Sequence, residues 1–110
     1  MRTESTLRDR RRRPTHPGVL LREDILPDAG LTQTRLAALL RVSRRSVNEI
    51  MQERRPVTPD MAHRLARVFR TTPEFWLAMQ QALDVWKTRQ ANRATYDRIR
   101  FWSRSGSLSA

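Results

Sequence analysis

The chain has 110 residues, a net charge of +11 at neutral pH and no cysteine. This length favours one domain of modest stability, which dimerisation would reinforce. The charge is carried almost entirely by arginine and favours a polyanionic partner such as nucleic acid, although arginine-rich compositions also occur without one. Disulfides, cysteine-ligated zinc and thiol catalysis are excluded, and no apolar run is long enough to span a membrane. We expect a cytoplasmic protein, because no apolar segment follows the charged N-terminus.

The uneven distribution of charge divides the chain into three predicted regions. Residues 1–14 contain six arginines and few apolar side chains, so we expect a disordered basic arm. Residues 15–87 carry the apolar periodicity of a folded domain. Residues 88–110 form a basic extension that is either helical or disordered and that ends in serines.

Five helical segments are predicted, of which the first begins at Pro17 and is closed by Pro27 and Gly30. The second and third follow Thr32 and Ser43, whose hydroxyls can accept free backbone N–H groups at a helix start. A tight turn joins these two segments, which predicts a helix-turn-helix. The contact between the two helices is expected to consist of Ala37 against Val47, with Leu36, Val42 and Ile50 beneath.

The fourth and fifth segments each begin with a threonine, a proline and an acidic residue, after Thr58 and Thr72. The apolar face of the fourth is predicted to contain Met61, Ala62, Leu65, Ala66 and Phe69, and that of the fifth Phe75, Trp76, Met79, Leu83 and Trp86. No segment shows the strict alternation of a half-buried strand, so the predicted fold class is all-α.

Polar side chains of the third segment share its outer face once Val47, Ile50 and Met51 point inward. Arginine suits guanine edges and asparagine suits adenine edges in the major groove of DNA. The candidates for base reading are therefore Arg44, Arg45, Asn48 and Glu49. Glu49 could accept a hydrogen bond from cytosine or orient Arg45, and we favour the second role. An arginine-rich helix face can also be only a solvated surface.

Phosphate contacts are expected around this segment. Gln33 begins the second helix, where free N–H groups favour an anion. The other phosphate-binding candidates are Arg35, Arg41, Arg54, Arg55 and Thr58. His16 and His63 are expected to pack, cap or face solvent, because neither has neighbouring ligands in the sequence. We therefore expect no metal, cofactor or catalytic constellation, and no enzyme.

The stretch from His16 to Trp86 resembles the HigA (VapI-like) antitoxin branch of the XRE-type helix-turn-helix family. The matching pieces are "HPGVLLREDIL", "GLTQTRLAALLRVSRRSVNEIMQERRPVTPDMAHRLARVF" and "TTPEFWLAMQQALDVW". The resemblance implies a five-helix lambda-repressor-like DNA-binding domain with an extended C-terminal helix. It also implies that Gln33 touches phosphate and that Ser43, Arg44, Arg45 and Asn48 face the major groove.

In function, the resemblance implies a homodimer that binds the double-stranded operator of its own operon and neutralises a HigB-type ribonuclease toxin. One departure is Arg41, which stands in the turn where many such proteins have glycine, so a left-handed conformation there would cost about 1 kcal/mol. A stand-alone repressor and a small ribonuclease using His16 or His63 are the alternatives. The tail residues Tyr96, Ile99, Phe101 and Trp102 could extend the last helix, seal a dimer interface or dock on a toxin.

Overall fold

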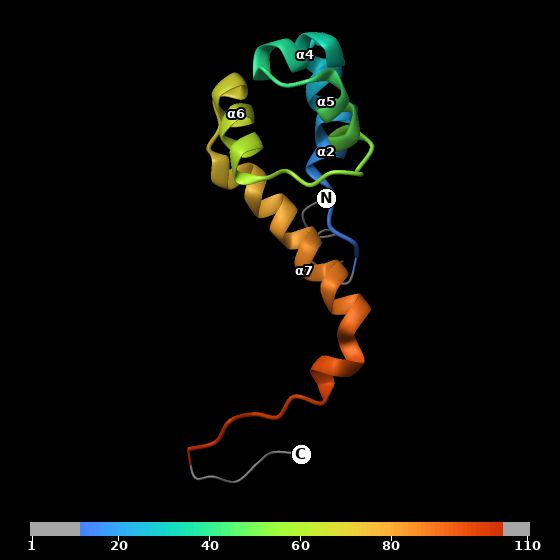
Figure 1. Cartoon of the computed structure of the whole chain (residues 1–110), viewed down its shortest axis with the longest axis vertical. Helices are drawn as coiled ribbons and strands as arrows, with labels where there is room; N and C mark the ends of the chain where they lie inside the picture. Colours follow the sequence, from blue (N-terminus) through green and yellow to red (C-terminus); the bar gives the residue numbers. More distant parts are fainter. Residues whose placement is uncertain (1–11, 105–110) are drawn as a thin grey trace, which may run out of the picture.

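The computed structural model describes residues 12–104, and within this range all regular structure is helical (Figure 1). The first stretch is continuous and contains α2 (Pro17–Leu20), the π-helical turn η1 (Leu21–Ile25) and α3 (Leu26–Ala29). It is followed by α4 (Gln33–Leu40), α5 (Arg44–Met51), α6 (Pro59–Phe69) and α7 (Pro73–Asp97). The prediction of an all-α fold with five helical stretches is therefore confirmed.

Pro27 does not close the first helical stretch, so that prediction was wrong. In η1 the backbone N–H of Leu26 donates to the carbonyl of Leu21, five residues back. This wide turn changes the hydrogen-bond pairing just before Pro27, which has no N–H of its own, and the chain stays helical to Ala29. Gly30 then ends the stretch in the left-handed region, with φ +67°, as expected.

The predicted threonine and serine caps all form. The side chains of Thr32, Ser43, Thr58 and Thr72 each accept a hydrogen bond from the backbone N–H three residues later. Arg41 ends α4 with φ 60° and ψ 44°, so the left-handed conformation expected in the turn is also confirmed. These local signals place the two helices of the helix-turn-helix where the sequence predicts them.

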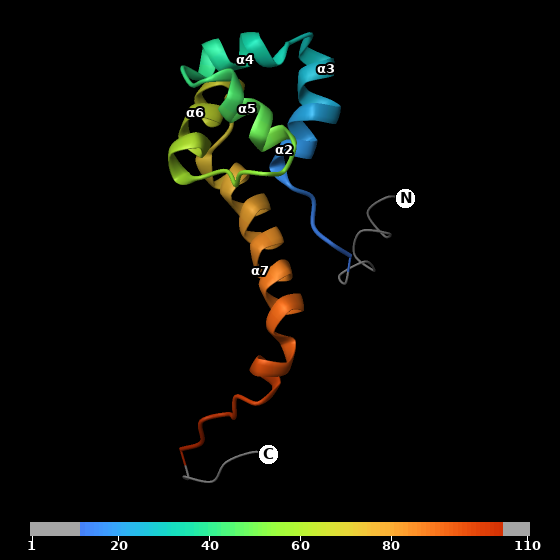
Figure 2. The same cartoon turned by 45° about the vertical axis from the view of Figure 1, so that its right-hand side comes forward.

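The core lies where α2, α4, α5 and α6 meet the first turns of α7 (Figure 2). Its fully buried members include Leu21, Leu36, Val47, Leu65 and Trp76. Phe75 was predicted to be buried and is not, because 44% of it is exposed. The buried face of α7 is centred on Trp76, Gln80 and Leu83, and Phe75 is rotated about 100° away from Trp76. Met79 and Trp86 are half-buried.

Beyond Trp86, α7 leaves the body of the molecule, and its remaining residues are exposed (Figure 1). The helix crosses the boundary expected at residue 87 without a break and stays helical to Asp97. Within it, Asn92 departs from helical geometry and marks a kink. Residues 1–11 of the expected basic arm and the serine-rich end after residue 104 lie outside the described residues.

Candidate nucleic-acid interface

The turn between α4 and α5 is fixed by backbone hydrogen bonds. The N–H of Arg41 donates to Ala38 O at 3.2 Å and that of Val42 to Ala37 O at 3.1 Å. Ala37 and Val47 are both buried in one core cluster, so the expected small contact residue is in place. The two short helices are therefore locked, and the outer face of α5 is presented to solvent.

The end of α5 lies very close to the first helix. A Cβ atom added at Gly18 would lie 1.9 Å from the carbonyl oxygen of Ile50. Arg22, from the next turn, donates from Nη1 to the carbonyl of Met51 at 2.7 Å and so binds one of the free carbonyls at the end of α5. The sequence had not singled out this role of Arg22, because it depends on contact between two helices.

His16 is buried and caps the first helix. Its Nδ1 accepts a hydrogen bond from the N–H of Gly18 at 2.9 Å. Burial lowers the pKa of His16 below its usual value, although the neighbouring Glu53 carboxylate acts in the opposite direction. The expectation of a packing or capping role is confirmed for His16. His63 is exposed on α6, and the described range holds no group of three side chains suited to a metal.

Glu49 holds two arginines on the outer face of α5. Its carboxylate accepts from Arg45 Nε at 3.1 Å and forms a second ion pair with Arg55 Nη2 at 2.7 Å. The hydrogen bond from Arg45, with the positive charge of Arg55, holds the pKa of Glu49 below its usual value. The favoured orienting role of Glu49 is therefore seen, and it extends to Arg55 from the following loop.

Ser46 is a member of this face that the sequence had not indicated. Its Oγ accepts from Arg55 Nη1 at 3.1 Å and from Ser43 Oγ at 2.9 Å. The spacing from the capping serine, three residues earlier, was the available signal. Ser46 and Glu49 together hold the guanidinium of Arg55 beside the row of candidate base-reading residues.

Asn48 is tied to the first residue of α4. Its Nδ2 donates to Gln33 Oε1 at 3.1 Å, and both side chains are half-buried. A candidate for base reading and a candidate for phosphate binding are therefore joined across the two helices. This bond limits the directions in which Asn48 can point and leaves its own carbonyl oxygen available as an acceptor.

The remaining candidates are spread around this centre. The side chain of Arg44 is exposed and forms no hydrogen bond with the described residues, whereas the hydroxyls of Ser43 and Thr58 are engaged in capping. Arg35, Arg41 and Arg54 are exposed as well. The structure therefore joins Gln33 to Asn48, and Arg45 and Arg55 to Glu49, in two groups that meet at the neighbouring residues Asn48 and Glu49 of α5.

A further arginine stabilises the turn from α6. Arg64 donates from Nη1 to the carbonyls of Leu40 and Arg41, at 2.8 and 3.3 Å. Asp60 accepts from Arg64 Nε at 2.8 Å and orients the guanidinium. The cation thus binds carbonyls at the negative end of α4, a role that no local signal in the sequence could indicate.

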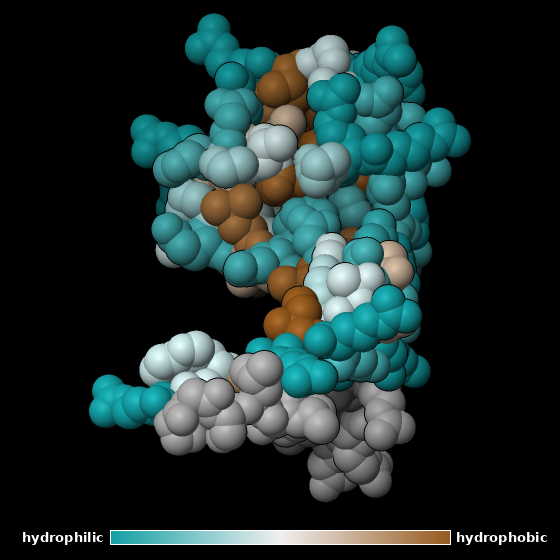
Figure 3. Space-filling view, turned by 60° about the horizontal axis from the view of Figure 1, so that its bottom comes forward, coloured by the Kyte–Doolittle hydropathy of each residue, from teal (hydrophilic) through white to brown (hydrophobic). Residues whose placement is uncertain are grey.

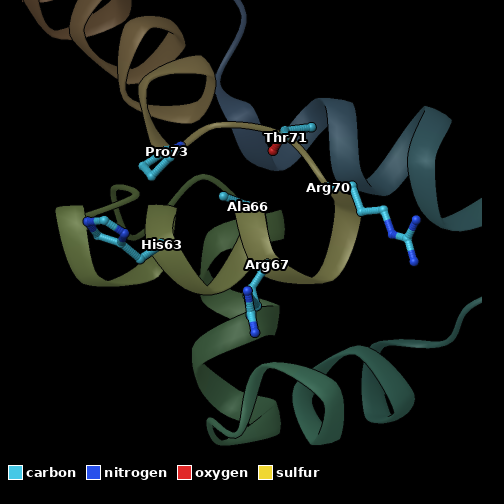
Figure 4. Close-up of a pocket in the computed structure, with 6 residues that line it drawn as sticks. All are labelled: His63, Ala66, Arg67, Arg70, Thr71 and Pro73. Atoms are coloured by element: carbon cyan, nitrogen blue, oxygen red, sulfur yellow. The ribbon is translucent and has the colours of Figure 1, made fainter.

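Figure 4 shows the residues that line a hollow beside α6 and the start of α7, two of them arginines. This hollow of about 750 Å³ is lined by His63, Ala66, Arg67, Arg70, Thr71 and Pro73. Its two arginines are exposed and carry no acidic partner among the described residues. This surface adds to the general attraction for a polyanion, but it lies apart from the row on α5.

A family comparison agrees with this geometry. The profile of a helix-turn-helix domain family matches residues 5–75 of the chain. The chain belongs to this helix-turn-helix family. The HTH-type transcriptional regulator YbaQ of Escherichia coli (strain K12) is 43% identical over 82 residues, which cover 74% of this chain and 73% of the regulator.

Relatives within the family include HigA antitoxins, so the resemblance noted in the sequence is confirmed. Antitoxin HigA-1 of Vibrio cholerae is 36% identical over 83 residues, which cover 76% of this chain and 78% of the antitoxin. The structure of the Pseudomonas aeruginosa antitoxin HigA with the higBA promoter has a TM-score of 0.75 and 36% identity. It covers 79% of this chain and 96% of that antitoxin. The chain is a DNA-binding protein of this family and not an enzyme.

No helix in residues 12–104 combines the length and the apolar character needed to cross a membrane.

Proposed function

We propose that the chain is the antitoxin of a HigB/HigA-type toxin–antitoxin system and represses its own operon. In this proposal it binds a double-stranded operator as a homodimer in the cytoplasm and neutralises a HigB-type ribonuclease toxin. The observation that carries the DNA-binding part is the pair of hydrogen-bonded groups on α4, α5 and the following loop, Gln33 with Asn48 and Glu49 with Arg45 and Arg55.

In the complex, Arg44, Arg45 and Asn48 read base edges in the major groove, and Ser43 lies at the entrance of the groove. Glu49 fixes the direction of Arg45 through the ion pair at 3.1 Å. The phosphate contacts come from Gln33 and from the surrounding residues Arg35, Arg41, Arg54, Arg55 and Thr58. Base contacts then supply sequence preference, while phosphate contacts supply affinity and register.

The exposed side of α7 supports the homodimer. Phe75, Ala78, Ala82 and Val85 repeat at the alternating spacing of three and four residues that is typical of a helix–helix seam, and all four are exposed. The two alanines would allow a second copy of α7 to approach closely. In a two-fold dimer on B-DNA, we expect the two α5 helices about 34–36 Å apart, one turn of the duplex.

Toxin neutralisation is supported by the antitoxin relatives, among them HigA-1 of Vibrio cholerae. A stand-alone repressor is the second candidate, because the relative YbaQ is described as a transcriptional regulator. The two functions share the same DNA surface and differ in whether a protein partner is bound.

Both parts of the proposal can be tested in one preparation. The chain is co-expressed with the product of the neighbouring gene, purified, and footprinted on the DNA upstream of the pair. We expect a stable complex of the two proteins and protection of a two-fold symmetric site. A protected site without a bound partner would contradict the antitoxin function and support the stand-alone repressor. The absence of any protected site would contradict both functions.

A further inference from the structure

Large apolar side chains stand exposed in the segment that follows α7. Ile99, Phe101 and Trp102 are 68, 74 and 82% exposed. Arginines alternate with them along the segment, at Arg98, Arg100 and Arg104. Figure 3, which brings this end of the molecule forward, shows brown, apolar side chains exposed among hydrophilic ones. A contiguous apolar patch at a protein surface often marks an interaction site.

A complementary hollow lies on α7 itself. It has a volume of about 470 Å³, is largely apolar, and is lined by Asp84, Val85, Thr88, Arg89 and Tyr96. Val85 is 61% exposed, so this surface is not covered by the rest of the described chain. The hollow is of a size to receive one or two aromatic side chains.

A kink in α7 lies within the stretch that lines the hollow. Asn92 has φ −123° and ψ 21°, outside helical geometry. Its Nδ2 donates to the carbonyl of Thr88 at 3.0 Å, which satisfies an acceptor that a straight helix would pair with a backbone N–H. Tyr96, eleven residues beyond Val85, lies about three helical turns further along α7 and lines the same hollow.

We propose that Phe101 and Trp102 of one protomer occupy the α7 hollow of a second copy, so that the two C-terminal segments are exchanged across the dimer. This rests on the homodimer of the proposed function. In its own chain the segment runs on beyond the end of α7 and does not return to the helix (Figures 1 and 2). Each protomer carries one aromatic pair and one hollow, so a two-fold arrangement fills both hollows at once.

Position and contact area favour the second copy as the occupant. Asp84, in the lining of the hollow, can pair with an arginine that flanks the aromatic pair, although the same lining also holds the basic Arg89. Val85 belongs both to the hollow and to the exposed α7 seam, so the two contacts form one continuous surface. Four buried aromatic side chains per dimer would add about 600–1,000 Å² of contact, at about 150–250 Å² each. This is a large part of a standard interface of about 1,600 Å².

The absence of cysteine from the sequence allows a direct test. Full-length Val85→Cys and Trp102→Cys variants are mixed and mildly oxidised, and cross-linked dimers are identified by mass spectrometry. We expect the mixed disulfide between the two variants to form. Gln90→Cys serves as the matched control, because Gln90 is exposed on the same helix and does not line the hollow. A mixed disulfide that is absent, or that forms equally with Gln90→Cys, would overturn the proposal.

Dimer dissociation is then measured by light scattering and dilution. Phe101→Ala/Trp102→Ala should raise the dissociation constant by about tenfold or more, since buried aromatics dominate such contacts. Gln90→Ala should leave it unchanged. If the wild-type chain is dimeric and the double variant has the same dissociation constant, the exchange of segments is ruled out and the proposed homodimer stands. If the wild-type chain is monomeric, both proposals are ruled out.

Discussion

At the scale of single residues, the proposed reading of DNA predicts that specificity depends on how firmly Glu49 holds Arg45 and Arg55. Glu49 pairs with Arg45 and Arg55, and its pKa lies below the usual value because of these partners. The carboxylate therefore stays ionised over the whole neutral range. In the proposed complex Glu49 lies close to the duplex, so its negative charge should disfavour non-specific DNA.

Glu49→Gln should separate these two effects. The amide keeps the shape of the side chain but removes the charge that fixes Arg45 and Arg55. We expect affinity for random DNA to rise and the preference for the footprinted site over random DNA to fall by about tenfold. Fluorescence anisotropy at fixed salt measures both affinities. Glu53→Gln is the control, because Glu53 pairs with Arg13 outside α5. An unchanged preference in Glu49→Gln would show that Glu49 does not position the reading side chains.

A second residue-scale prediction concerns His16. Because burial lowers its pKa in the folded protein, the unfolded chain binds more protons around pH 6.5, the usual value for histidine. The free energy of unfolding should therefore be highest above this pH and should decrease as the pH falls below it. His16→Asn, which keeps a capping side chain but does not titrate, should remove this decrease. Denaturant unfolding at several pH values measures it.

The matched control for this experiment is His63→Asn, since His63 is exposed on α6. It should retain the pH dependence of the wild-type protein. If His16→Asn and the wild-type protein lost stability in parallel as the pH falls, the buried histidine would not be the group that causes the pH dependence.

At the scale of helices, local rules predicted where most elements begin but not how they are joined. The caps at Thr32, Ser43, Thr58 and Thr72 were visible because each acts within its own turn of helix. The π-helical turn and the kink at Asn92 were not predicted. Neither were the hydrogen bonds of Arg22 and Arg64 to other helices, since these depend on tertiary packing.

The same reason explains which parts of the site were predictable. The periodicity of α5 placed Arg44, Arg45, Asn48 and Glu49 on its outer face. The bond between Asn48 and Gln33, and the two contacts that hold Arg55, depend on where α4 and the loop after α5 lie in space. Sequence could therefore name the row of side chains but not the network that fixes their directions.

Gly18→Ala tests the contact between the first helix and α5. The added methyl group would collide with the carbonyl of Ile50, so we expect a loss of stability of about 1–3 kcal/mol and a displaced end of α5. Operator affinity should fall even at temperatures where the variant is folded. Thermal unfolding and DNA titration at low temperature measure the two effects.

Gly30→Ala is the companion variant. Unlike Gly18, Gly30 has a positive φ, and nothing lies within 4 Å of an added Cβ, so only conformational strain of about 1 kcal/mol is expected. Its operator affinity should match that of wild type once both are folded. Equal DNA binding by Gly18→Ala would show that the close approach to Ile50 does not position α5.

At the scale of the whole molecule, the chain combines a compact helical body with one long helix that leaves it. The principal extents are 59 × 34 × 23 Å, and the long axis follows α7 (Figure 2). The surface that we propose for DNA lies on α4 and α5, whereas the surfaces that we propose for a second copy lie along α7. This separation would allow dimerisation and DNA binding to occur together, with the net charge of +11 supplying general attraction to the duplex.

The most direct test of the central claim is a paired titration of wild type and Asn48→Ala against the footprinted site and a random duplex, each at several salt concentrations. Asn48 joins the two helices at the middle of the proposed reading surface. We expect the variant to lose about 1–3 kcal/mol on the specific site and almost nothing on random DNA, with an unchanged salt dependence. Equal losses on both duplexes would contradict sequence reading by α5.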